Sequence, residues 1–214
     1  EARGDQVSEE VIIKAIEKIK PLDIKHICPG HGPILSKNHR YFVELTNKYA
    51  LDYLSDTTEK ARRSILIAYV SAYGYTKQAA EIIRSGILET DNFRVEMADI
   101  EHIDLNELGS LLATTDAFLV GSPTINQNTL LPVYKMFALI NPIRDRGKLA
   151  GVFGSYGWSG EAVRIITETL RSLKLKMFEE TAEFKFQPSG PKEENLKDFG
   201  RKFARRFAEE NQNK

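Results

Sequence analysis

The sequence contains very little cysteine, no excess of either charge and no long apolar run. Cys28 is the only cysteine among 214 residues, which excludes an internal disulfide and is typical of a protein in a reducing cytosol. Lysine plus arginine and aspartate plus glutamate number 30 each, so no basic field attracts nucleic acid. No apolar run approaches the roughly 20 residues that span a membrane. We therefore expect a soluble, cytoplasmic protein with no nucleic-acid and no membrane partner.

The first part of the chain predicts only a small unit. Apolar positions at helical spacing predict helices over residues 8–19, with Ser8 as the N-cap, and over residues 38–54. A short apolar run predicts a strand over residues 24–28, followed by a bent loop rich in proline and glycine. A helix, a strand and a helix of this size cannot bury a full core. The segment is therefore interpreted as the tail of another domain.

The chain begins at Glu1 rather than at a methionine, which favours a piece of a longer protein. A change of pattern near Arg62 predicts two domains, residues 1–62 and residues 63–214. In the second, apolar strands alternate with amphipathic helices, which predicts an α/β fold with a doubly wound, five-stranded parallel sheet. The expected strands are 65–70, 94–97, 117–121, 149–154 and 176–186, and the expected helices are 76–89, 104–113, 131–140, 160–173 and 193–209.

A hydroxyl-rich turn follows the first expected strand of the second domain. Ligands of open parallel sheets bind at the carboxyl ends of the strands, and this turn leads directly into a helix whose free N–H groups favour an anion. It lacks the glycine pattern of a P-loop or of a dinucleotide-binding turn. The turn predicts a phosphate site, although an ordinary capped connection is the alternative. Its residues are Ser71, Ala72, Tyr73, Gly74, Tyr75 and Thr76.

Two further loops are expected at the same edge of the sheet. The third strand ends at Gly121 and is followed by Ser122, Pro123, Thr124, Ile125 and Asn126. The fourth ends in a glycine-rich loop that carries the only tryptophan of the chain, Trp158, whose indole favours contact with a flat heteroaromatic ring. The alternative is that Trp158 covers the core of its own domain. The residues of this loop are Ser155, Tyr156, Gly157, Trp158, Ser159 and Gly160.

In order and spacing, the three loops resemble the FMN loops in the flavodoxin-like domain of the flavodiiron proteins, also called A-type flavoproteins. The resemblance covers nearly all of residues 64–209, including the closing helix with Phe199, Gly200 and Arg201. It implies that the first loop holds the FMN phosphate. It also implies that the second loop lines the ribityl chain and one side of the flavin, and that the third borders the isoalloxazine ring. The cofactor supplies the redox chemistry, and the protein binds, orients and tunes it.

The segment from Ile24 to Leu35 is similar to the last strand and loop of the metallo-β-lactamase-like domain that precedes the flavin domain in that family. The resemblance places His31 at the position of a diiron ligand. One histidine cannot hold a diiron centre, and the sequence shows no His-x-Glu/His-x-Asp-His cluster. We therefore expect that a full-length parent reduces dioxygen or nitric oxide, whereas this chain alone carries electrons. A hydrogen-bonded turn histidine is the alternative for His31.

The resemblance also implies partners. A flavodiiron protein receives electrons from rubredoxin or from a reductase and forms a homodimer in which the flavin of one subunit approaches the iron of the other. A different class remains open, namely a stand-alone flavodoxin-type electron carrier or a partner-binding module that docks through residues 12–54. A metal-dependent hydrolase is disfavoured, because the sequence lacks the ligands that such an enzyme requires.

Overall fold

The protein is described by a computed structural model that covers residues 4–30, 32–59, 63–90 and 93–212. It divides into two compact units, Glu1–Ala61 and Arg62–Lys214. Among the described residues, no helix is both long enough and apolar enough to cross a membrane.

The first unit consists of two helices that pack against each other, α1 (Gly4–Ile19) and α2 (His39–Glu59). Helix α1 begins at Gly4 rather than at the predicted N-cap Ser8, because no proline or other helix breaker separates the two positions. The strand predicted over residues 24–28 is wrong. Ile27 and Leu35 form only an isolated antiparallel bridge, with N–O distances of 3.0 and 2.9 Å. A run of apolar residues cannot extend such a bridge without a neighbouring strand to complete the ladder.

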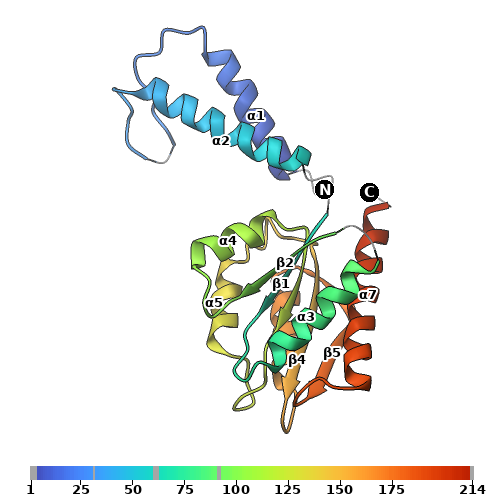
Figure 1. Ribbon diagram of the computed structural model, residues 1–214. Helices are drawn as coiled ribbons and strands as arrows, with labels where there is room; N and C mark the ends of the chain where they lie inside the picture. Colours follow the sequence, from blue (N-terminus) through green and yellow to red (C-terminus); the bar gives the residue numbers. More distant parts are fainter. Residues whose placement is uncertain (1–3, 31, 60–62, 91–92, 213–214) are drawn as a thin grey trace. The chain divides into compact units, whose positions relative to one another are not determined.

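The second unit is a five-stranded, all-parallel sheet in the order β2-β1-β3-β4-β5. Helices α3 and α7 cover one face, and α4 and α5 lie on the other (Figure 1). Helix α6 packs on the same face as α4 and α5. The doubly wound sheet expected from the alternating pattern is confirmed. Its elements are β1 (Ser64–Tyr69), α3 (Tyr75–Leu88), β2 (Arg94–Asp99), α4 (Leu105–Thr114), β3 (Ala117–Gly121), α5 (Leu131–Leu139), β4 (Leu149–Tyr156), α6 (Glu161–Ser172), β5 (Lys176–Lys185) and α7 (Pro191–Gln212).

Two hydrophobic cores form, one on each face of the sheet. Ile65 and Ile67 of β1 pack toward α3 and α7, whereas Leu66 and Ala68 pack toward α4, α5 and α6. All four side chains are fully buried, since neighbouring strand residues point to opposite faces and helices cover both. Helix α7 contributes three phenylalanines to its core, Phe199, Phe203 and Phe207.

Four basic residues of α7 lie in ion pairs, namely Lys197, Arg201, Lys202 and Arg206. Arg201 reaches Glu89 at 2.8 Å and Glu194 at 2.7 Å, and Lys202 reaches Glu180 at 3.1 Å and Asp198 at 3.2 Å. These pairs lower the pKa of Glu89, chiefly through hydrogen bonds from Lys197 and Arg201. The predicted solvated, charge-balanced face explains this run of positive residues.

Asp145 stabilises the loop that connects α5 to β4. Its side chain is fully buried and accepts hydrogen bonds from the backbone N–H of Asn141 at 2.9 Å and from Arg144 at 2.7 and 2.9 Å. Lys148 lies 2.9 Å away and donates to the carbonyl oxygens of Leu112 and Ala113 at the end of α4. Burial opposes ionisation of Asp145, but the hydrogen bond from Arg144 and the charge of Lys148 outweigh it and lower the pKa. Ionised Asp145 therefore joins this connection to α4.

We expect Asp145→Ala to destabilise the protein by about 3 to 5 kcal/mol, because Lys148 would remain buried without its carboxylate. Urea unfolding followed by circular dichroism measures the change. Asp198→Ala, which breaks a half-exposed pair with Lys202, is the control and should change stability by less than about 1 kcal/mol. Because folding lowers the pKa of Asp145, ionised Asp145 stabilises the folded protein at a pH above the pKa of this carboxyl group in the unfolded chain. This contribution to stability is lost as the pH falls through the folded-state pKa. Equal effects of the two substitutions would contradict this account.

Candidate functional site

Three loops leave the same edge of the sheet, at the carboxyl ends of β1, β3 and β4. Parallel pairing aligns Tyr69 with Gly121, and Gly121 with Phe153, so these strands end at nearly the same level. The backbone N–H of Val70 donates to the carbonyl of Gly121 at 3.0 Å. The strand order reverses between β1 and β3, which is where open sheets of this type bind ligands.

The first loop opens α3 with few side-chain contacts of its own. Gly74 occupies the N-cap with a φ of 81° and has no side chain with which to cap the helix. The N–H groups of Tyr75 and Thr76 precede the first hydrogen bond of the helix, from Gln78 N to Gly74 O at 2.9 Å. Space beside Gly74 is open. The loop therefore leaves an amide-rich, positively polarised helix end accessible to an anion.

The two hydroxyl groups expected to hold a phosphate lie in different surroundings. Ser71 Oγ accepts a hydrogen bond from the backbone N–H of Lys77 at 3.2 Å and lies near the surface. Thr76 is 1% exposed, and its Oγ1 lies 3.0 Å from Ser155 Oγ of the third loop. Thr76 consequently joins two loops through a buried hydrogen bond, a role that the sequence did not indicate.

The second loop is closed by its own backbone. Ile125 and Asn128 exchange two hydrogen bonds of 3.1 Å around Asn126 and Gln127, whose φ values of 52° and 58° are left-handed. Two consecutive residues of this kind form the tight turns that are typical of hairpins. The shape of this loop is therefore set by hydrogen bonds of its own backbone.

Thr124 connects the second loop to the third. Its backbone N–H donates to the carbonyl of Ser155 at 2.8 Å, and its Oγ1 accepts from the N–H of Ala162 at 3.1 Å. Ser122 is completely buried, and its hydroxyl donates to the carbonyl of Pro123 at 2.9 Å. Together with the contact between Thr76 and Ser155, these hydrogen bonds join all three loops into one network.

Trp158 stands almost completely free of the domain, with 95% of its side chain exposed. The alternative interpretation of Trp158 as a cover over its own core is wrong, because no part of the core lies beneath it. Tyr73 of the first loop is also strongly exposed, at 78%. A large aromatic side chain in water gains nothing from folding, so its place on a fixed loop favours contact with a bound ring.

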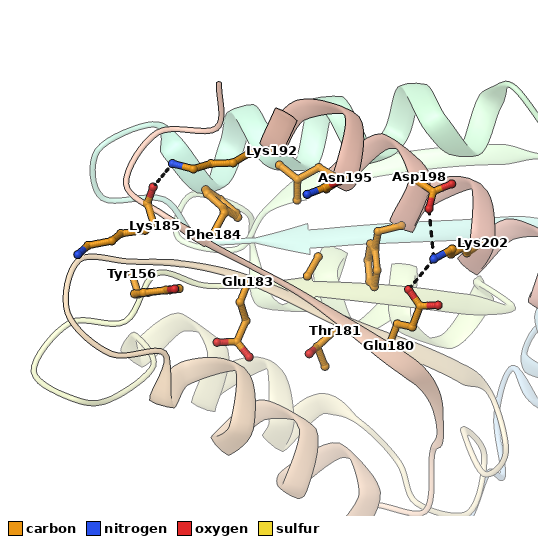
Figure 2. A pocket seen from close by; sticks show the side chains of 13 residues that line it. Tyr156, Glu180, Thr181, Glu183, Phe184, Lys185, Lys192, Asn195, Asp198 and Lys202 are labelled. Atoms are coloured by element: carbon orange, nitrogen blue, oxygen red, sulfur yellow. Dashed lines mark hydrogen bonds and ion pairs between the residues drawn. The ribbon is translucent and has the colours of Figure 1, made fainter. Parts of the chain in front are cut away.

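The structure contains a separate groove of about 470 Å³ along the outer strand β5 and the helix α7. Figure 2 shows Lys202 between Glu180 and Asp198, and Lys192 donating to the carbonyl of Lys185 at 2.7 Å. Of the third loop, only Tyr156 lines this groove. The groove is therefore distinct from the site formed by the three loops.

Sequence reasoning missed two residues that lie beside the end of β4 although they are distant from it in the sequence. Phe186 directly follows β5, and its N–H donates to the carbonyl of Tyr156 at 2.8 Å. Glu183 pairs with Gly154 across the two strands. Neither belongs to a recognisable motif, and only the pairing of β5 with β4 brings them to the third loop.

The predicted metal ligand His31 lies outside the described residues. Among the residues that the structure describes, no group of three or more histidine, cysteine, aspartate or glutamate side chains could hold a metal ion. The three loops thus constitute the candidate site, and a metal role for His31 stays a prediction.

The sequence profile of the flavodoxin family matches residues 67–199. The chain belongs to the flavodoxin family. A solved archaeal flavodoxin is 30% identical with a TM-score of 0.59, and the match covers 68% of this chain and 99% of that protein. A flavodoxin domain implies FMN as the cofactor.

Longer flavoproteins match both units of this flavodoxin-family chain. The "Type A flavoprotein fprA" of Rhodobacter capsulatus is 37% identical over 193 residues, which are 90% of this chain and 44% of that protein. The "Flavo-diiron protein FprA2" of Clostridium acetobutylicum is 34% identical over 195 residues, with coverages of 91% and 48%. The solved rubredoxin oxygen:oxidoreductase of Desulfovibrio gigas matches with a TM-score of 0.66 and 25% identity, over 94% of this chain and 49% of that one.

The predicted resemblance to flavodiiron proteins is therefore confirmed. The chain spans about half the length of the curated relatives that it matches.

The residues present fit FMN. The N–H groups of Tyr75 and Thr76 at the start of α3 offer donors to a phosphate, and the open space beside Gly74 lets it approach. The exposed indole of Trp158 offers an apolar face to a flavin ring. Both features lie at the same edge of the sheet and are joined by the Thr76 and Ser155 contact.

We expect Gly154→Ala to damage the site and to destabilise the flavodoxin domain by about 1 to 3 kcal/mol. A methyl group on Gly154 would lie 2.7 Å from both the carbonyl oxygen of Ser122 and Val163 Cγ2. Gly109→Ala in α4 is the control, because a methyl group there meets nothing within 4 Å. It should stabilise the protein by about 0.5 to 1 kcal/mol. Thermal unfolding of both variants tests the prediction, and a neutral Gly154→Ala would contradict it.

Proposed function

We propose that this chain binds FMN non-covalently at the carboxyl edge of β1, β3 and β4, and that it transfers electrons as the flavin domain of a flavodiiron-type protein. The observation that carries the proposal is the hydrogen-bonded network that joins the three loops, with Trp158 exposed on the third. A preformed set of loops lowers the ordering cost of binding a cofactor.

Each loop has a distinct part in this proposal. The N–H groups at the start of α3 and the hydroxyl of Ser71 hold the phosphate, and the dipole of α3 favours its negative charge. Residues 122–126 line the ribityl chain and one side of the flavin, and Trp158 packs beside the ring. Bound FMN supplies one- and two-electron redox chemistry, while the protein orients the ring and limits the access of water.

The activity of a longer parent protein is part of the proposal. The relatives named for their diiron content are about twice as long as this chain. We infer that the first unit is the end of a metallo-β-lactamase-like domain and that His31 supplies one ligand to a diiron site completed by other residues. Such a parent would reduce dioxygen or nitric oxide.

A donor of the rubredoxin type agrees with the name of the Desulfovibrio gigas relative. A homodimer and a cytoplasmic location stay predictions.

A stand-alone electron carrier is the second candidate. It is favoured by the archaeal flavodoxin, because 68% of this chain suffices to match 99% of that complete protein. The length of the native open reading frame separates the two candidates. A reading frame of about twice this length with further histidine and carboxylate ligands supports the flavodiiron assignment, whereas a frame of this length supports the carrier.

We expect the purified chain to bind one equivalent of FMN, seen as a flavin absorption spectrum that survives desalting. Binding should quench the fluorescence of Trp158, which is the only tryptophan and is therefore a specific probe. Acid release and chromatography identify the flavin. A chain that retains no flavin and shows no quenching when titrated with FMN would contradict the proposed function.

Ser71→Ala combined with Thr76→Ala should weaken FMN binding at least about tenfold. The first substitution removes a hydroxyl donor to a charged phosphate, and the second removes the buried link to Ser155, each worth about 1 to 3 kcal/mol. A matched control is Ser110→Ala with Thr114→Ala in α4, whose exposed hydroxyls bond only to their own helix. Fluorescence titration measures both pairs. Equal affinity in the two double variants would remove the first loop from the site.

A further inference from the structure

The end of β5 runs beside the third loop. Strand pairing places Glu183 opposite Gly154 and Lys185 opposite Tyr156. The pairing continues one residue further, because the N–H of Phe186 donates to the carbonyl of Tyr156 at 2.8 Å. The last residues of β5 are therefore tied to the start of the loop that carries Trp158.

Phe186 has an unfavourable backbone conformation. Its φ of 58° is left-handed, which for a bulky side chain costs on the order of 1 to 3 kcal/mol. The conformation brings the ring against Gly157, where a methyl group would lie 3.3 Å from Phe186 Cε1. The ring is 54% exposed, so core burial does not explain its position. The ring has two neighbours, Gly157 on the third loop and the Nζ of Lys185, which lies 5.5 Å from the ring centroid.

Glu183 makes a second contact with the same loop. Figure 2 shows its side chain and that of Thr181 on one side of β5, opposite to Phe184. The carboxylate occupies the space that a methyl group on Gly160 would need. Burial raises the pKa of this carboxyl group. The carboxylate lies against Gly160, the N-cap of α6, where the positive end of the helix dipole favours a negative charge.

The two contacts lie on either side of Trp158. Phe186 meets Gly157, immediately before Trp158, and Glu183 meets Gly160, two residues after it. A methyl group at 160 would displace the carboxylate of Glu183, and one at 157 would press on the ring of Phe186, so the two glycines let these side chains approach the loop closely. Because β5 is held by β4 and by α7, its end offers a fixed support to an otherwise exposed loop.

We propose that Phe186 and Glu183 are positioning residues of the flavin site, which hold the Gly157–Gly160 segment and thereby fix the orientation of Trp158. This inference rests on the proposed function, since it assigns Trp158 to the flavin. Neither residue needs to touch the cofactor. Their effect passes through the two glycines.

The test compares Phe186→Gly and Glu183→Ala in the full chain. Phe186→Gly removes the ring and relieves the left-handed strain, so the melting temperature should not fall. We expect each variant to weaken FMN binding about tenfold, because Trp158 is no longer held in place. Phe186→Tyr and Glu183→Gln, which keep the contacts, should restore the affinity. Glu180→Ala is the control, because Glu180 lies on the same strand but pairs with Lys202 of α7.

Fluorescence anisotropy of Trp158 in the FMN-free chain gives a second readout. We expect lower anisotropy in Phe186→Gly and Glu183→Ala than in the wild type, and an unchanged value in Glu180→Ala. Affinities within twofold of the wild type, or loss of affinity that the conservative variants do not restore, would overturn the proposal. If the wild type binds no FMN, the proposed function is wrong, and Phe186 and Glu183 have no role in flavin binding. Unchanged anisotropy in the two variants would show, independently of FMN, that these residues do not hold the loop that carries Trp158.

Discussion

The buried hydrogen bond between Thr76 and Ser155 is the interaction on which the candidate site depends, because it joins loops that are 79 residues apart in sequence. Ser155 also accepts, through its carbonyl, the N–H of Thr124 from the second loop. One residue thus links all three loops at the point where the strand order reverses. A buried polar pair is costly to leave unsatisfied, so each partner constrains the other. The positions of the three loops therefore depend on this hydrogen bond and on the sheet from which the loops extend.

The sheet explains why the loops meet. Strands β1, β3 and β4 are parallel neighbours, buried on both faces by helices, and their side chains leave no freedom for a shift in register. Their carboxyl ends therefore lie side by side, and the residues that follow them converge. The outer strand β5 extends this arrangement, since its end reaches the third loop through Phe186. The FMN binding that we propose suits loops that are joined to one another by hydrogen bonds of their own.

Much of this arrangement was predictable. The alternation of apolar strands and amphipathic helices indicated the doubly wound sheet, and the three loops were expected at one edge because parallel strands place their carboxyl ends together. The strand over residues 24–28 was predicted wrongly, since apolar composition does not supply a pairing partner. The expected end of the fourth strand at residue 154 fell short, because pairing with Lys185 extends β4 to Tyr156. Thr76 was expected to hold a phosphate, and the structure adds a contact with Ser155 that the sequence did not indicate.

The sequence by itself determined the fold class, the order of the loops and the family resemblance, because these follow from local periodicity and from short runs of neighbouring residues. Tertiary structure alone decided which side chains meet. The contacts of Phe186 with Gly157 and of Glu183 with Gly160 join residues more than 20 positions apart. The exposure of Trp158 likewise depends on how the other elements of the domain pack around its loop. Such contacts arise from strand register and helix packing, which no local pattern of residues encodes.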